Sequence, residues 1–90
     1  MLDERYSQAL AALKEQAQIQ SDLEALDYNL DAASPEDAAK FRARMDAVAA
    51  SMGKYRTECG RIMQIAYDHD DPEFSIAGLT PERLARLLGG

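Results

Sequence analysis

Apolar residues recur at alternating steps of three and four through the middle of the chain. The row has nine members: Ala38, Phe41, Met45, Val48, Met52, Tyr55, Cys59, Ile62 and Ala66. Because a helical turn takes 3.6 residues, such steps keep every member on one face of an α-helix. The row therefore predicts one helix over about residues 35–68 that lies along another helix.

A similar row precedes it and predicts a helix over about residues 2–33. That stretch has no Gly or Pro and is rich in residues that favour helices. Its members are Leu2, Tyr6, Ala9, Leu13, Gln16, Ile19, Leu23, Leu26 and Leu30. The polar Gln16 stands where the spacing of the row is irregular. Gly53 lies next to Met52, the residue that we expect Gln16 to face. Together they predict a local bend there, with a hinge or a close approach of a partner backbone as the alternative.

The segment 34–37, Ser-Pro-Glu-Asp, has the composition of a helix start. Ser34 can cap free N–H groups, and Pro35 fits the first helical position. If the chain folds back here, members of the two rows pair so that their residue numbers sum to 67 or 68. The two rows then face each other along their whole length, which predicts an antiparallel helical hairpin over residues 1–69.

Charge is distributed in agreement with this hairpin. Residues 1–33 carry seven acidic and two basic residues, whereas residues 34–69 carry six basic and five acidic ones. The same pairing brings Asp22 and Glu24 near Arg44, and Asp27 near Lys40. Such exposed pairs fix the orientation of the helices more than they stabilise the fold.

The C-terminal segment, residues 70–90, is predicted to contain a loop and a short third helix over about residues 80–88. Thr80 and Pro81 repeat the helix-start pattern, and Leu84, Leu87 and Leu88 form one apolar face. We expect this helix to fold over the open end of the hairpin. The chain is then a single all-α domain over residues 1–90, and so thin a unit is expected to assemble into a helical-bundle homodimer.

The net charge and the length of the apolar runs disfavour nucleic acid and membranes as partners. A net charge of −6 disfavours direct binding to nucleic acid or to anionic membranes. No apolar run is long enough for a membrane span or a secretory signal, so we expect a cytoplasmic location. Cys59 is the only cysteine, and its place in the row predicts a small buried apolar group.

Catalytic and metal-binding patterns are weak. His69 is the only histidine, and the motifs HExxH and CxxC are missing from the sequence. The acidic loop 68–73 lacks the ligand spacing of an EF-hand and is predicted to be solvated, although weak binding of a divalent cation stays open. The sequence therefore predicts no enzyme, no cofactor and no metal site.

We expect instead a non-enzymatic protein that acts through protein–protein contacts, as an adaptor, a chaperone-like subunit or an inhibitor. The candidate interface residues are Tyr6, Leu10, Tyr28, Met63, Ile65, Tyr67 and Phe74. One alternative is an acidic decoy that blocks a nucleic-acid-binding or nuclease partner through Asp22, Glu24, Asp27, Asp31, Asp70 and Asp71. A second alternative is a structural subunit that polymerises by stacking hairpins.

Overall fold

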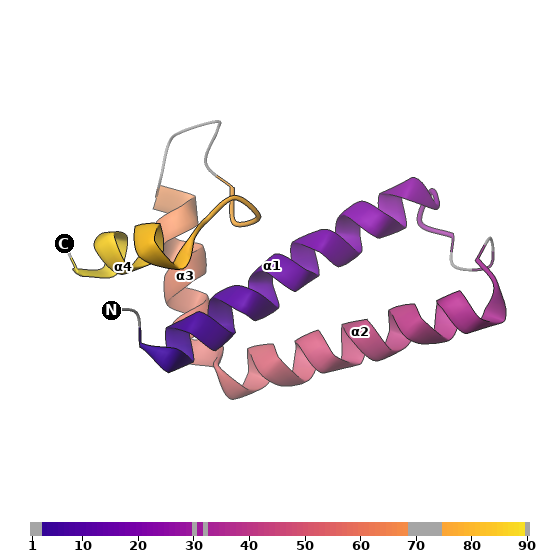
Figure 1. The fold of residues 1–90 in the computed structure, drawn as a ribbon, viewed down its shortest axis with the longest axis horizontal. Coiled ribbons are helices and arrows are strands. Elements are labelled where there is room, and N and C mark those ends of the chain that lie inside the picture. The colour runs from indigo at the N-terminus through magenta and orange to yellow at the C-terminus, as the bar shows by residue number, and fades with distance from the viewer. Residues whose placement is uncertain (1–2, 30, 32, 69–74, 90) are drawn as a thin grey trace.

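Helices make up most of the structure, a computed structural model that describes residues 3–29, 31, 33–68 and 75–89. Over these residues the chain forms four α-helices and no strand: α1 (Glu4–Ala25), α2 (Pro35–Lys54), α3 (Arg56–Asp68) and α4 (Pro81–Gly89). The predicted all-α class is confirmed. Helix α2 runs back along α1, α3 turns away from α2, and α4 lies beside α1 and α3 (Figure 1).

Helix α1 ends about eight residues before the predicted boundary at residue 33. Asp27 and Tyr28 adopt left-handed backbone conformations, with φ of 53° and 59°. The Tyr28 N–H donates to the Leu23 carbonyl at 2.8 Å, and the Asp27 N–H to the Glu24 carbonyl at 3.0 Å. These two bonds form a Schellman motif, which closes a helix without a glycine here because Asp tolerates the left-handed region. The prediction for the end of this helix was wrong, since only the absence of Gly and Pro had supported a longer one.

The predicted start of the second helix is confirmed. The Ser34 hydroxyl accepts a hydrogen bond from the Asp37 N–H at 3.2 Å, and Pro35 is the first helical residue. Glu36 and Asp37 place negative charge in the first turn of α2, where the helix dipole is positive.

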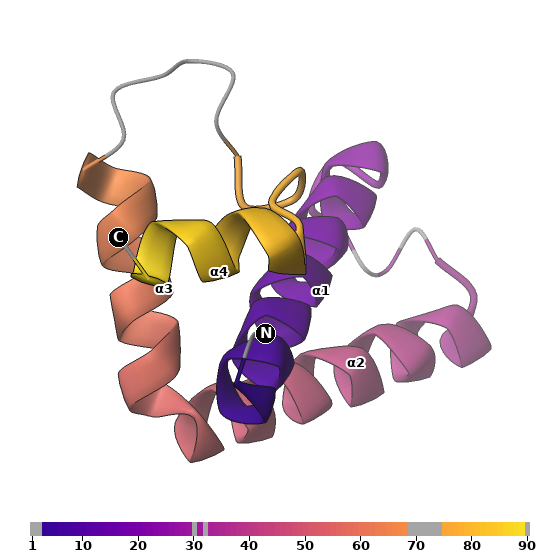
Figure 2. The ribbon, with the colours of Figure 1, turned by 60° about the vertical axis from the view of Figure 1, so that its left-hand side comes forward.

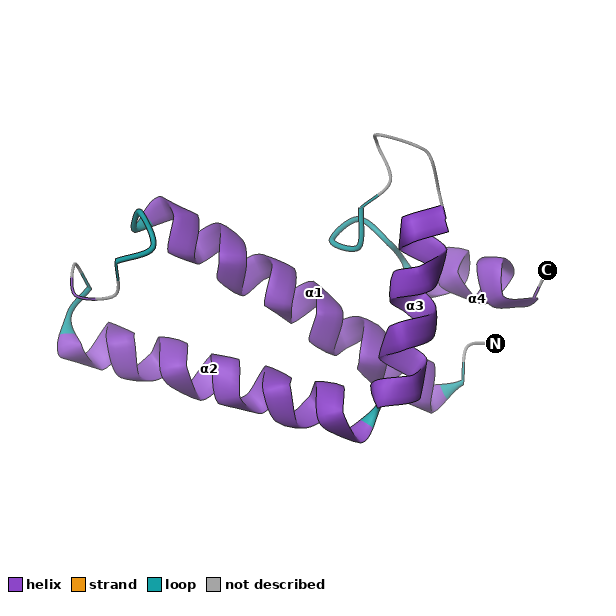
Figure 3. Cartoon of the chain, turned by 180° about the vertical axis from the view of Figure 1, so that it is seen from behind, coloured by secondary structure: helices purple, strands orange, loops and turns teal. Residues whose placement is uncertain are grey.

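The single helix predicted over residues 35–68 is wrong, because the chain bends between α2 and α3. Tyr55 lies at the bend with φ of −110° and ψ of 38°. Its N–H completes the last bond of α2 to the Ser51 carbonyl, and its carbonyl accepts the first bond of α3 from the Cys59 N–H. The local bend predicted at Gly53 is thus a complete break two residues later, visible from behind in Figure 3.

Helix α1 packs against both α2 and α3. Two contacts show that the predicted pairing of residues holds on each side of the bend. The Arg44 guanidinium lies 3.0 Å from the Asp22 carboxylate, as predicted. The Cys59 thiol lies 3.9 Å from the Ala9 carbonyl, so this predicted pair also meets. Glu24, which was also predicted near Arg44, accepts a hydrogen bond from the Tyr28 hydroxyl at 3.1 Å.

The C-terminal helix covers the open end of the hairpin, as predicted. The Thr80 hydroxyl caps α4 by accepting from the Arg83 N–H at 3.1 Å, and Lys14 of α1 donates to the Leu79 carbonyl at 3.0 Å. Leu79 and Leu84 are fully buried. They join side chains of α1 and α3 in one core, composed of Ala9, Leu10, Leu13, Cys59, Ile62, Leu79 and Leu84. Figure 2 shows α4 lying across α1 and α3.

Candidate protein interface

Burial differs sharply between the two ends of the α1–α2 hairpin. The end covered by α4 holds the core, whereas α2 buries only Ala38 and Val48 over its whole length. The part of α1 that lies along α2 adds Ala12 and Ile19. The free end is therefore two helices thick, and apolar side chains there remain partly in contact with solvent.

An uncharged groove opens on one side of the contact between α1 and α2. It encloses about 290 Å³, and all its lining residues come from these two helices. We call it the hairpin groove; its lining is Gln16, Ile19, Gln20, Leu23, Met45, Val48, Ala49 and Met52. Met45 is 42% exposed, and Leu23 and Met52 are half-buried. Apolar and amide side chains with no charge among them suit contact with another protein surface more than with a charged ligand.

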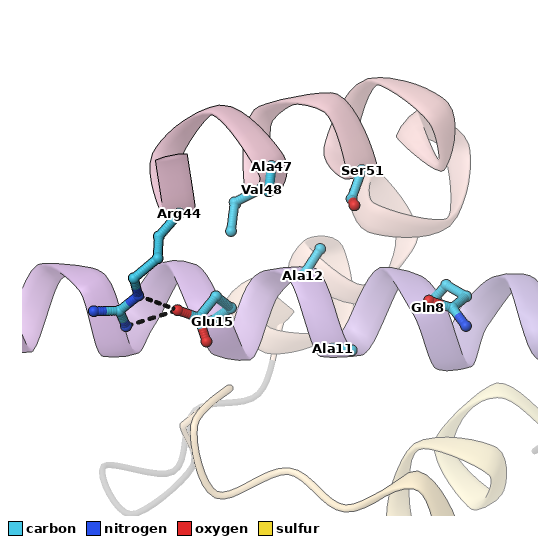
Figure 4. A pocket seen from close by; sticks show the side chains of 8 residues that line it. All are labelled: Gln8, Ala11, Ala12, Glu15, Arg44, Ala47, Val48 and Ser51. Atoms are coloured by element: carbon cyan, nitrogen blue, oxygen red, sulfur yellow. Dashed lines mark hydrogen bonds and ion pairs between the residues drawn. The ribbon is translucent and has the colours of Figure 1, made fainter. Parts of the chain in front are cut away.

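The opposite side of the same contact is lined mainly by small side chains and has an ion pair at its rim (Figure 4). Arg44 of α2 lies 2.6 Å from the Glu15 carboxylate and 3.0 Å from that of Asp22. These carboxylates raise the pKa of Arg44. A hydrogen bond from Gln18 and then one from Arg44 lower the pKa of Asp22. The rest of the lining consists of Gln8, Val48 and four small side chains, Ala11, Ala12, Ala47 and Ser51. We interpret this side as a structural contact that fixes the register.

The residues predicted for the interface do not form one surface. Tyr28 is 67% exposed and lies just beyond α1, at the free end of the hairpin. Met63 and Tyr67 are 50% and 88% exposed, but they lie on α3. Two regions of the molecule therefore carry exposed residues from the predicted set.

Other members of the predicted interface serve the fold. Leu10 is 2% exposed and belongs to the core, so in this fold it is not available to a partner protein as predicted. Ile65 and Tyr6 are partly buried against that core, and the Tyr6 hydroxyl accepts a hydrogen bond from Arg61 at 3.3 Å. Phe74 lies outside the described residues.

The predicted acidic surface is likewise divided. Asp22 is paired with Arg44, and Glu24 accepts from Tyr28. Asp27 and Asp31 are exposed at the turn between α1 and α2. Asp70 and Asp71 lie outside the described residues, as does most of the acidic loop 68–73.

Sequence reasoning missed a partly buried ion pair between α1 and α3. Arg5 Nε donates to Glu58 Oε1 at 2.5 Å, and Glu58 is only 8% exposed. This hydrogen bond, together with one from the backbone N–H of Glu58 itself, lowers the pKa of Glu58 below its ordinary value of 4.5. The predicted pairing already placed residues 5 and 58 at the same end of the hairpin, which was the one available signal.

Chemistry at the remaining polar groups is limited. Across the described ranges, no three His, Cys, Asp or Glu side chains gather closely enough to hold a metal ion. Burial raises the pKa of the Cys59 thiol, and the nearby Glu58 carboxylate adds to the effect, so the reactive thiolate is disfavoured. In the described part of the chain, no helix has the length and apolar character needed to cross a membrane.

Comparison of the chain with protein-family models, with curated proteins and with solved structures gives no match.

Proposed function

We propose that this protein is a non-enzymatic helical protein that acts through protein–protein contacts, with the hairpin groove as its contact surface. The observation that carries the proposal is the uncharged lining of this groove, which runs between α1 and α2 from Met52, beside the core, towards the part of the hairpin that lacks a third layer. Partly exposed methionines suit such a surface because their flexible, polarisable side chains adapt to a partner.

A second copy of the chain is the partner that the groove fits best. Each copy carries a net charge of −6, so two copies repel each other wherever acidic surfaces meet. The hairpin groove avoids this cost because none of its lining residues is charged. Two hairpins packed groove to groove form a four-helix bundle with two-fold symmetry.

The acidic-decoy alternative has less support. Two of its predicted residues, Asp22 and Glu24, already have hydrogen-bond partners within the chain. No contact among the described residues favours polymerisation by stacked hairpins over a closed dimer.

Two matched methionine substitutions test the proposal by sedimentation equilibrium over a range of concentrations. Met45 lies in the hairpin groove, and Met63 is exposed to a similar degree on α3, outside it. The wild-type protein and Met63→Asp should dimerise, whereas Met45→Asp should remain monomeric because it places a charge in the apolar contact. Circular dichroism should show the same helix content for all three.

The opposite pattern has a clear meaning. If Met63→Asp abolishes the dimer and Met45→Asp leaves it intact, the contact lies on α3. That helix carries Met63, Ile65 and Tyr67, three of the interface residues predicted from the sequence. If the wild-type protein is monomeric at every concentration, self-assembly through the groove is wrong.

A further inference from the structure

The bend at Tyr55 leaves backbone groups of α2 and α3 without helical partners. Cys59 is the first residue of α3 whose N–H bonds to a carbonyl four residues earlier. The N–H groups of residues 56–58, and the carbonyls of residues 52–54 that they would meet in an uninterrupted helix, are therefore unpaired within the helices. Other contacts must compensate for these lost bonds if the bend is to persist.

Arg5 of α1 contacts the residues on both sides of the bend. Its Nε donates to the Glu58 carboxylate at 2.5 Å, and its Nη2 donates to the free carbonyl of Lys54 at 3.4 Å. Its guanidinium carbon also lies 5.2 Å from the centre of the Tyr55 ring, within cation–π range. One side chain thus binds the last residue of α2, the residue at the bend and the first turn of α3.

Glu58 is well placed at the start of α3 in the bent chain. In the bent chain it lies in the first turn of α3, where its carboxylate is close to the positive end of the helix dipole. Its Oε2 atom is buried and has no hydrogen-bond partner among the described residues. Arg5 is therefore the main compensation for a carboxylate that has left water.

The apolar row itself does not require a bend. The steps between Met52, Tyr55 and Cys59 are three and four, so the row continues in phase from α2 into α3. Apart from its chain neighbours and the backbone of its own helix, nothing lies within 4 Å of the position that a Cβ at Gly53 would occupy, so a side chain fits there in the bent form. The same residues can accordingly present one apolar face in a straight helix over residues 35–68.

We propose that α2 and α3 alternate between this bent form and one continuous helix, and that the contacts of Arg5 with Lys54, Tyr55 and Glu58 hold the chain in the bent form. Loss of the Arg5–Glu58 pair shifts the population towards the straight helix. In the bent form, Leu79 and Leu84 bury themselves against α1 and α3. Straightening moves α3 and so alters the covering of the core by α4.

Distances between spin labels at Ala39 and Met63 test this directly. Both positions are exposed, and Cys59→Ser in all samples removes the competing thiol. Labelled chains are diluted into unlabelled protein, so that only distances within one chain are measured, whether or not copies associate. In a straight helix the two positions lie about 36 Å apart along the axis, at 1.5 Å per residue. The bent chain must give a clearly shorter distance.

Arg5→Ala and Glu58→Gln are compared with Arg42→Ala, which removes the same charge as Arg5→Ala from an exposed position on α2. The background protein and Arg42→Ala should give the short distance. Arg5→Ala and Glu58→Gln should each show a new population near the straight-helix distance, with helix content unchanged or raised by circular dichroism.

Two outcomes overturn the proposal. One is a short distance in both Arg5→Ala and Glu58→Gln while they remain helical, because Arg5 is then not what holds the bend. The other is a loss of helix content in both variants without the long distance, because the pair then stabilises the fold and no straight state exists.

Discussion

The two ends of the hairpin carry apolar rows of the same spacing but bury them to different extents. At the end covered by α4, Ala9 and Ile62 are fully buried, and residues of three helices and of the segment before α4 pack around them. At the free end, Met45 is 42% exposed although it belongs to the same row as Ile62. Burial is thus determined by whether a third layer is present, and the row alone does not distinguish a completed core from a surface that another protein can cover.

The largest difference in stability between the two ends should appear when an isoleucine at each end is shortened to alanine. Ile62→Ala should lower the free energy of unfolding by ~4 kcal/mol and Ile19→Ala by ~2 kcal/mol, because a cavity beside an open groove collapses or hydrates more readily. Urea denaturation of dilute monomeric protein measures both. Equal losses would mean that the free end is as well packed as the covered end.

The ion pair at the covered end should make its stability depend on pH. The folded pKa of Glu58 is lowered, so the pair contributes fully above the ordinary value of 4.5 and is lost as the pH falls through the folded pKa. The stability gap between the wild-type protein and Glu58→Gln should therefore be largest near neutral pH and shrink in acid. Denaturant titrations at several pH values measure it, and a gap that stays constant with pH would contradict this role for Glu58.

Removing the cap of α4 should destabilise the protein more than removing the cap of α2, because the two caps lie at different ends of the hairpin. Thr80→Ala should cost ~1 kcal/mol, since α4 unfolds together with the core, and Ser34→Ala about half of that, since the start of α2 can fray on its own. Thermal denaturation compares the two variants. A larger loss for Ser34→Ala would place the free end within the cooperative unit.

The smallest effect should come from the turn beyond α1. Asp27→Gly should raise the free energy of unfolding by ~0.5 kcal/mol, because glycine adopts the left-handed conformation at residue 27 without a steric cost. Asp31→Gly, at an exposed position of the same turn, is the matched control and should not stabilise the protein. Chemical denaturation distinguishes the two, and stabilisation by both variants would point to a general effect of charge removal.

Local signals in the sequence were sufficient for some elements of the fold. Ser34 and Thr80 cap helices as predicted, because a hydroxyl followed by proline acts over a single turn. The row also placed Ala9 beside Cys59 and Arg44 beside Asp22. These predictions depended only on helical periodicity and on one turn.

The remaining features depend on contacts between distant residues. The row has the same phase on both sides of Tyr55, so it could not locate the break, which is accompanied by contacts from Arg5, some fifty positions earlier in the chain. Leu10 was assigned to an interface because it lies off the row, but that position faces the C-terminal segment. The hairpin groove was missed because its methionines look like core residues until the third layer is seen to end.

Hydrogen exchange at low and high protein concentration tests the central claim that the covered end is a finished core and the free end a surface for a second copy. At low concentration, amides of residues 9–13 and 59–62 should exchange far more slowly than those of residues 19–23 and 45–52. Raising the concentration should slow exchange only in the second group. Uniform rates along the hairpin that do not change with concentration would contradict the account.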